Sequence, residues 1–297
     1  MNREIIRWAV VPAAGLGTRL LPITIGKPKE MIRIHTLDKN GHLCFKPLLQ
    51  ITFERLYEFG VRDFCFIINE AKNSIKDYFT INGDLVKESS KENKLQADVA
   101  LLDFYEKLSL SRLAFVNQPT PRGFGDAVLR AEPNVEGPFL VHAGDNYILS
   151  KEHHYLERLL TIHRDFKSDA TFIVKEVENT KSFGIAEGNE VSNGVYQVQR
   201  VAEKPQKATT NLGIIALYVF EPSIFDALKR TQVDSKGELQ LTDAIQTLLN
   251  SGHKAMAVKL DKEEHWFDIG TPQSYQAALA QSRRYFQCLG NTEIILG

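Results

Sequence analysis

The sequence predicts an α/β protein in which parallel strands are joined by helices. Short apolar runs alternate along the chain with longer amphipathic segments, which is the pattern of buried strands and crossover helices. The apolar run over residues 8–11 leads into a stretch with glycines at positions 15 and 17, and a glycine turn commonly follows the first strand of such folds. The 297 residues, 43% of them hydrophobic, can form one large α/β domain or two smaller ones.

Seven strands are expected, because each is a short apolar run bounded by polar or turn residues. They are residues 8–13, 64–69, 113–117, 139–143, 170–174, 195–202 and 213–220. Asn193-Gly194 is the preferred two-residue hairpin turn, and it predicts a hairpin over residues 191–199.

Four helices are expected between and after these strands. In the first, residues 46–59, the apolar side chains share one helical face, and Gly60 follows as its C-cap. Thr242 is expected to cap the start of the last helix. The other three helices are residues 97–108, 153–166 and 241–249.

Two segments fall outside this alternation. Residues 35–45 are expected to form an excursion between the glycine turn and the first helix. The charged stretch 87–94 is expected to be a solvated loop. The pattern becomes mainly helical after a boundary near residue 220.

The charge balance and the cysteines narrow the class of protein. The 36 Lys and Arg residues against 37 Asp and Glu residues give a net charge of −1, so no general attraction to nucleic acid or membranes is expected. Three widely separated cysteines argue against a disulfide framework or a cysteine-rich zinc site. With no signal peptide and no apolar run of the roughly 18 residues that a membrane span needs, we expect a cytoplasmic protein.

The stretch after the first strand has the features of a triphosphate-binding loop. Gly15 and Gly17 let the backbone turn tightly and bring its N–H groups close to a ligand. Arg19 supplies a forked cationic donor and Lys29 a point charge, both suited to phosphate oxygens. The dinucleotide fingerprint is incomplete here, and Pro28 stands where a P-loop has Ser or Thr. The alternative is an ordinary strand-to-helix turn, which the two cations disfavour.

Two carboxylates are candidate metal ligands. Asp145 follows an apolar run, so it is expected at the carboxyl end of a strand, in the same crevice as the glycine loop. Asp268 stands between an aromatic pair and a glycine turn. Two carboxylates with phosphate oxygens can complete the octahedral shell of Mg²⁺. The alternative for each is a turn or capping aspartate, which spacing alone favours for Asp268.

Polar residues after two other strands are candidates for reading a base and a sugar phosphate. The amide of Gln118 offers the donor and acceptor that a nucleobase edge requires. Lys204 can neutralise a phosphate and Glu203 can accept hydrogen bonds from sugar hydroxyls, although a surface charge pair is the slightly favoured alternative on sequence alone. Residues 238–243 have no clear physical interpretation beyond a helix start.

These motifs together resemble a known family. In order they are the glycine loop with Arg19 and Lys29, Gln118 with Gly123, Gly144-Asp145, Phe183-Gly184, Glu203-Lys204-Pro205, residues 238–243 and Asp268-Ile269-Gly270-Thr271-Pro272. The ordered set, spread over residues 8–285, resembles the sugar-1-phosphate nucleotidylyltransferases, most closely their prokaryotic uridylyltransferases. The resemblance implies a Rossmann-like, mixed and mainly parallel sheet flanked by helices. It also implies Mg²⁺ dependence and transfer of a uridylyl group from UTP to glucose 1-phosphate with release of pyrophosphate.

The same resemblance implies a role for each motif. Arg19 and Lys29 would be catalytic and contact the triphosphate, while Asp145 and Asp268 would bind Mg²⁺. The nucleotide would be held by Ala13, Ala14, Gly15, Gly17, Thr18, Gln118, Gly123 and Asp145. The sugar phosphate would be held by Gly184, Glu203 and Lys204. Residues 1–220 would form the catalytic core, and residues 221–297 would complete the site through Asp268 and carry a candidate interface for a homo-oligomer.

Three alternatives stay open on the sequence alone. A proline after Gln118 is also found in the thymidylyltransferase branch of the family, which uses dTTP, whereas residues 27–31 and 238–243 favour the uridylyl branch. A nicotinamide-dependent dehydrogenase would have a third loop glycine where this chain has Leu20. A non-catalytic nucleotide-sugar-binding regulator would be expected to lack one of the phosphate cations or metal carboxylates.

Overall fold

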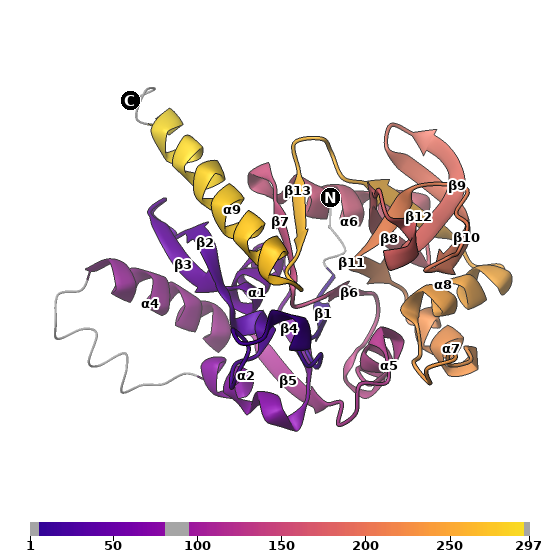
Figure 1. The fold of residues 1–297 in the computed structure, drawn as a ribbon, viewed down its shortest axis with the longest axis horizontal. Helices are drawn as coiled ribbons and strands as arrows, with labels where there is room; N and C mark the ends of the chain where they lie inside the picture. The colour runs from indigo at the N-terminus through magenta and orange to yellow at the C-terminus, as the bar shows by residue number, and fades with distance from the viewer. Residues whose placement is uncertain (1–5, 81–94, 294–297) are drawn as a thin grey trace.

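A nine-stranded sheet with helices on both faces forms the centre of the molecule (Figure 1). The structure is a computed structural model that describes residues 6–80 and 95–293; the expected loop at 87–94 lies outside them. The strand order is β5 (Arg112–Asn117), β4 (Asp63–Ile68), β1 (Trp8–Pro12), β6 (Phe139–His142), β11 (Leu212–Phe220), β8 (Ala170–Glu176), β12 (Ala255–Lys259), β10 (Val195–Glu203) and β9 (Gly184–Ser192). β10 and β11 run opposite to the others. The expected mixed, mainly parallel α/β sheet is confirmed.

The continuous apolar sequence of β1 explains why helices cover both faces of the sheet. Successive side chains of a strand point to opposite faces. Trp8 and Val10 are buried in one hydrophobic cluster, and Ala9 and Val11 are buried in another. The first cluster includes side chains of α5 (Phe124–Leu129), α7 (Ser223–Arg230) and α8 (Leu241–Asn250). The second includes side chains of α1 (Leu48–Glu58), α2 (Asn73–Tyr78), α4 (Leu95–Ser109) and α6 (His154–Phe166).

Two small antiparallel pairs lie beside the main sheet. β2 (Arg33–Leu37) and β3 (Leu43–Pro47) form a hairpin, so the excursion expected at residues 35–45 is an ordered element. β7 (Asn146–Leu149) pairs with β13 (His265–Asp268), which joins segments more than 100 residues apart. The long helix α9 (Pro272–Glu293) packs on β2 and β13 (Figure 1).

All seven expected strands are present, and the hairpin turn at Asn193-Gly194 joins β9 to β10. The four expected helices correspond to α1, α4, α6 and α8. Gly60 ends α1 with a φ of 99°, directly after the C-cap residue Phe59. The expectation for Thr242 is wrong, because α8 begins after Gln240 and the buried Thr242 side chain packs against β9 instead.

The segment after residue 220 supplies β12 to the main sheet as well as helices α7, α8 and α9. β12 reads Ala-Met-Ala-Val-Lys, whose alanines and methionine favour a helix locally, and its pairing with β8 and β10 overrides that preference. Within the described part of the chain, no helix is long and apolar enough to cross a membrane.

Candidate active site

The loops after β1 and β6 come together at the carboxyl ends of these parallel strands. β1 pairs with β4 on one side and with β6 on the other, so their C-terminal ends lie side by side. The N–H of Gly144, after β6, donates to the carbonyl of Pro12 at 3.1 Å. This bond joins the turn that carries Asp145 to the start of the glycine loop. Open α/β sheets bind their ligands at this edge.

Lys29 and Asp145 form an ion pair in this crevice. Lys29 begins the short 3-10 helix η2 (Lys29–Met31), and its Nζ donates to Asp145 Oδ2, with both side chains mostly buried. Burial acts to lower the pKa of Lys29, but attraction to Asp145 and Glu30 outweighs it and raises the pKa. Burial acts to raise the pKa of Asp145, but Lys29 lowers it below its usual value. A Cβ on Gly15 would lie 3.6 Å from Lys29 Nζ, so the glycine loop passes next to this pair.

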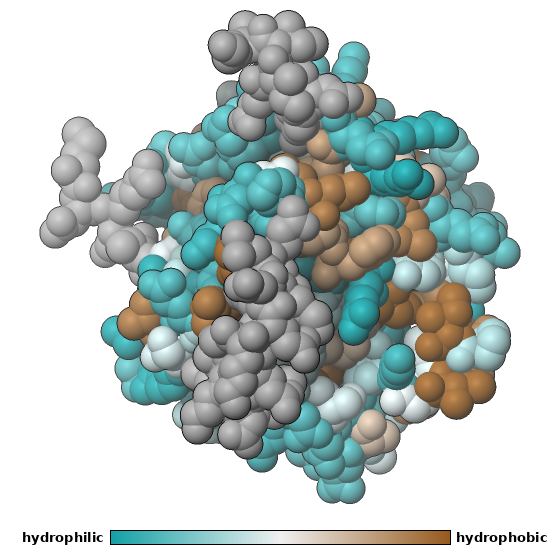
Figure 2. Space-filling model, turned by 90° about the vertical axis from the view of Figure 1, so that its left-hand side faces the viewer, coloured by the Kyte–Doolittle hydropathy of each residue, from teal (hydrophilic) through white to brown (hydrophobic). Residues whose placement is uncertain are grey.

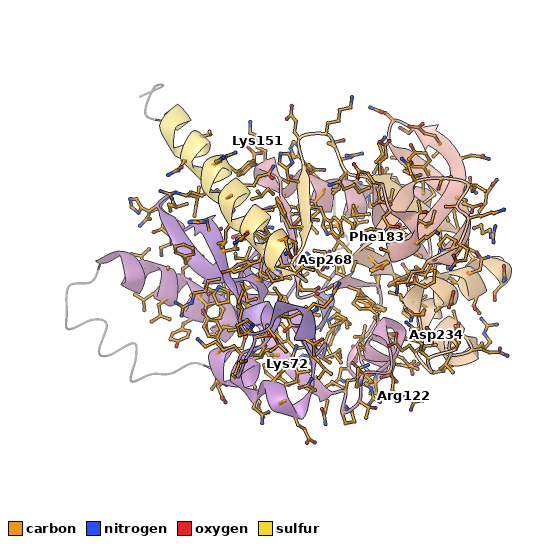
Figure 3. The ribbon with its side chains drawn as sticks, in the orientation of Figure 1. Lys72, Arg122, Lys151, Phe183, Asp234 and Asp268 are labelled. Carbon is orange, nitrogen blue, oxygen red and sulfur yellow. The ribbon has the colours of Figure 1, made fainter. Side chains whose placement is uncertain are left out.

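Asp268 lies next to Asp145 because β13 pairs with β7. Asp268 is opposite Asn146 in the register, and the N–H of Ile269 donates to the Asp145 carbonyl at 3.0 Å. Figure 3 shows Asp268 near the centre of the molecule, at the end of β13. Burial raises the pKa of Asp268, and the negative charge of Asp145 raises it further. Asp268 therefore lies beside the other candidate carboxylate, Asp145.

Arg19 reaches the same place from the 3-10 helix η1 (Thr18–Leu20). A Cβ on Gly270 would lie 2.7 Å from Arg19 Nη2 and 3.4 Å from Asp268 Oδ1, so Gly270 leaves room for both side chains. Gly15, Thr18 and Arg19 are exposed to solvent and accessible to a ligand.

The donor set of this cluster suits a divalent cation that also binds phosphate. Among the described residues, no group of three or more His, Cys, Asp or Glu side chains forms an all-protein metal site. Asp145 and Asp268 provide two neighbouring carboxylates, and Mg²⁺ is usually bound by one or two carboxylates together with substrate phosphates and water.

Gln118 and Gly123 form a second group beyond the end of β5. Gln118 is 4% exposed, and its Nε2 donates to the carbonyl of Gly123 at 3.2 Å and to Asp126 Oδ2 at 2.8 Å. Its backbone N–H donates to the Ile68 carbonyl at the end of β4. Gly123 has a φ of 100°, and a Cβ there would lie 2.5 Å from the carbonyl oxygen of Leu239.

Gly184, Glu203 and Lys204 form a third group where β9 meets β10. Gly184 pairs with Glu203 in the sheet register. Lys204 has a φ of 43°, is about half exposed, and donates to Glu203 Oε1 at 2.8 Å. A Cβ on Gly184 would lie 2.5 Å from Thr242 Oγ1 and 3.2 Å from Glu203 Oε2. The glycine thus lets Thr242 and the Glu203 carboxylate approach the backbone.

Two segments, residues 238–243 and the strand that carries Trp266, connect the three groups. Residues 238–243, which the sequence left without an interpretation, touch Gly123 through Leu239 and Gly184 through Thr242. The ring of Phe183 meets that of Trp266 at 5.8 Å, and Trp266 Nε1 donates to Asn146 Oδ1, next to Asp145.

The sequence analysis did not identify the polar side chains that donate hydrogen bonds to the backbone carbonyls of the glycine loop. Lys72 Nζ donates to the Ala13 carbonyl at 2.6 Å, and Asn69 Nδ2 donates to the Ala14 carbonyl at 2.7 Å. Asn69 directly follows β4, and Lys72 ends the short 3-10 helix η3 (Glu70–Lys72) after it, so polar residues after a central strand were the available signal.

Comparison with known proteins shows the family of this chain. The family model described as nucleotidyl transferase matches residues 8–284. The chain belongs to the nucleotidyl transferase family. The UTP–glucose-1-phosphate uridylyltransferase of Bacillus subtilis is 36% identical over 272 residues, covering 89% of this chain and 87% of that protein. A putative enzyme of the same name from Methanocaldococcus jannaschii is 34% identical, with 82% of each chain covered.

Solved structures of relatives share the fold of this nucleotidyl transferase. A UDP-glucose pyrophosphorylase complexed with UDP-glucose has a TM-score of 0.78 and 28% identity, covering 95% of this chain and 99% of that one. A UTP-bound enzyme from Acinetobacter baumannii has a TM-score of 0.79 and 27% identity, with 93% of each chain covered. The expected resemblance is confirmed. Nucleotidyltransferases of this family generally use a divalent metal.

Proposed function

We propose that this protein transfers a uridylyl group from UTP to glucose 1-phosphate, giving UDP-glucose and pyrophosphate. The observation that carries the proposal is the convergence of Arg19, Lys29, Asp145 and Asp268 beside an exposed glycine loop. Relatives that match most of the chain bear the name of this activity. A non-catalytic relative would be expected to have lost one of these four side chains.

The nucleotide would lie along the glycine loop. The backbone N–H groups of residues 14–17 donate to no acceptor within the described residues, so they can bind a ligand. In the proposal, Ala13, Ala14 and Gly15 read the uracil together with Gln118 and Gly123. Gly17, Thr18 and Asp145 complete the nucleotide site, and Arg19 and Lys29 face the triphosphate.

The chemistry requires no covalent protein intermediate. A phosphate oxygen of glucose 1-phosphate attacks the α-phosphorus of UTP in line, and pyrophosphate leaves with the electrons of the broken P–O bond. Both reactants are anionic, so charge repulsion opposes their approach. Arg19 and Lys29 offset it on the nucleotide side, while Lys204 does so on the sugar phosphate, which Gly184 and Glu203 help to hold.

We propose that Mg²⁺ is the divalent cation and that Asp145 and Asp268 hold it. Bound there, the ion would neutralise phosphate charge and help to orient the triphosphate. In the structure Lys29 contacts Asp145, so the lysine holds this carboxylate in place and can turn to the triphosphate when nucleotide binds.

We also propose a cytoplasmic homo-oligomer. Cys44 and Cys65 are free thiols, which fits a reducing compartment. The side that carries β2, β3 and α9 shows hydrophobic patches among hydrophilic ones (Figure 2), and Phe45 on β3 is 57% exposed. Light scattering coupled to size exclusion would show a mass above that of one 33.6 kDa chain.

Pyrophosphate release across UTP, dTTP, CTP, ATP and GTP, each with several sugar 1-phosphates, tests the proposed substrates. We expect UTP with glucose 1-phosphate to be fastest and dTTP to be slower. The thymine methyl is the only difference on the base, and such a group is worth about 1–3 kcal/mol in a pocket. Faster turnover of dTTP would assign the chain to the thymidylyltransferase alternative, and rapid turnover of ATP or GTP would contradict the proposed base site.

A further inference from the structure

We infer that Lys72 and Asn69 are positioning residues that set the geometry of the base-reading backbone, and that Lys72 also aims Lys29 through Glu30. The inference rests on the proposed function, because it assigns these residues to the nucleotide half of that site. The relevant feature is the orientation of the carbonyl groups of the glycine loop. Base recognition by backbone groups requires that the peptide planes of the loop stay in one orientation.

Each carbonyl at the start of this loop is held by a different part of the fold. Pro12 O accepts from the N–H of Gly144 at 3.1 Å. Ala13 O accepts from Lys72 Nζ at 2.6 Å, and Ala14 O accepts from Asn69 Nδ2 at 2.7 Å. With these oxygens turned inward, the N–H groups of residues 14–17 are left for a ligand.

Lys72 Nζ donates three hydrogen bonds, which is as many as an ammonium group can donate. Besides Ala13 O, its Nζ donates to Glu30 Oε1 at 2.9 Å and to Oε2 at 2.7 Å. Glu30 is 1% exposed and Lys72 is buried, so both charges depend on this pairing. Figure 3 shows Lys72 in the lower part of the molecule, near α2.

Glu30 connects Lys72 to the phosphate cation. It follows Lys29 directly in η2, and a Cβ on Gly144 would lie 3.0 Å from Glu30 Cγ. The carboxylate therefore lies between Lys72 and the turn before Asp145. One buried ion pair thus anchors both the loop that reads the base and the turn that presents Lys29.

The test removes both charges together, because an unpaired buried charge would itself destabilise the fold. The double variant Lys72→Met with Glu30→Gln should raise the KM for UTP about tenfold, the effect of one lost positioning contact, and leave the KM for glucose 1-phosphate within about twofold. The preference for UTP over CTP should fall by a similar factor, because a mobile backbone reads the base edge less strictly.

A matched control exists in the buried pair of Lys46 and Glu54. Their side chains meet at 2.7 Å between β3 and α1, and both are similarly buried. The double variant Lys46→Met with Glu54→Gln should lose comparable thermal stability without a change in the KM for UTP or in base preference. Asn69→Ala should also reduce the preference for UTP over CTP. Asn117→Ala is its control, because it removes a bond to Glu70 at the exposed end of β5 and should leave that preference unchanged.

The outcomes separate this inference from the proposed function. Calorimetric binding of UTP alone measures the nucleotide site without turnover, so it applies even if glucose 1-phosphate proves to be the wrong acceptor. The inference is supported if UTP binding is weaker and base preference is reduced in the Lys72 and Asn69 variants but not in the control variants. Equal losses for both substrates, or the same losses in the Lys46 control, would show a general packing role and overturn it.

Discussion

The surroundings of the two carboxylates of the site, Asp145 and Asp268, shift their pKa values in opposite directions. Lys29 lowers the pKa of Asp145, whereas burial and the charge of Asp145 raise the pKa of Asp268. A folded-state pKa above the unfolded value means that ionised Asp268 costs folding free energy above that pKa, and that the cost disappears as the pH falls through it. A carboxyl group whose pKa is raised by burial and by a neighbouring charge is a candidate for binding a ligand, and our proposal gives Asp268 that role.

Replacing Asp268 by Asn should therefore separate activity from stability. Turnover should fall by roughly a hundredfold or more, because charge that opposes the phosphate repulsion can no longer be bound there. The melting temperature at neutral pH should stay the same or rise, because the repulsion with Asp145 is relieved. Steady-state kinetics and thermal denaturation of the same preparation check both parts. A parallel loss of activity and melting temperature would indicate a structural role for Asp268.

Lys204 should act on the acceptor and not on the nucleotide. Its side chain is about half exposed and paired with Glu203, on a strand far in sequence from the glycine loop. We expect Lys204→Met to raise the KM for glucose 1-phosphate about tenfold and to leave the KM for UTP within about twofold. Lys259→Met, which removes a surface pair with Glu176, is the control. An unchanged response to glucose 1-phosphate would remove Lys204 from the site.

At the scale of elements, residues 238–243 join the base side of the site to the sugar side. Gly123→Ala would place a Cβ against the Leu239 backbone at a φ of 100°, so it should cost more than about 2 kcal/mol of stability as well as weaken UTP use. The atoms nearest to a Cβ at Gly270 belong to the flexible end of Arg19 and the carboxylate of Asp268, so Gly270→Ala meets side chains and not backbone first. It should raise the KM for UTP without lowering the melting temperature. Equal destabilisation by both variants, measured by urea unfolding, would contradict this difference.

The elements that the sequence predicted are those whose pattern is local. The apolar run of β1, the helical face of α1 and the Asn193-Gly194 turn each carry their own signal. β12 and β13 do not, because β12 has the composition of a helix and β13 has only four residues. Their positions depend on pairing with distant strands, which no local pattern encodes.

The residues of the candidate site also differ in whether a local sequence pattern could predict them. The glycine loop, Arg19 and Lys29 could be found by their type and spacing. Asp268 was only a weak candidate on spacing, and its place beside Asp145 comes from the pairing of β13 with β7. The bonds from Lys72 and Asn69 to the loop carbonyls could not be found, since they are tertiary contacts across β1 and β4.

At the scale of the whole molecule, two buried histidines, His142 and His163, and the partly buried His153 make stability depend on pH. Burial lowers the pKa of His142 and of His163 to about 4, and that of His153 to about 3. The unfolded chain takes up these protons near pH 6.5 while the folded chain does not, so stability falls as the pH drops from about 7 towards 4, by up to about 1.4 kcal/mol per pH unit for each histidine.

Urea unfolding between pH 7.5 and 5 should show this decline. His153→Asn should flatten the slope, because Asn tolerates the left-handed conformation of this residue and does not titrate. His154→Asn, at the next and exposed position, should leave the slope unchanged. A free energy of unfolding that is constant over this range would contradict the neutral state of these three histidines.

In our proposal, Arg19, Lys29, Asp145 and Asp268 form one site for uridylyl transfer. A phosphorus NMR time course of the purified protein with UTP, glucose 1-phosphate and Mg²⁺ tests it most directly, because each phosphate species has its own signal. We predict that UDP-glucose and pyrophosphate appear in equal amounts, and that Asp268→Asn and a chelator each abolish both signals. Formation of UDP and inorganic phosphate, or unchanged product formation by Asp268→Asn, would contradict the account.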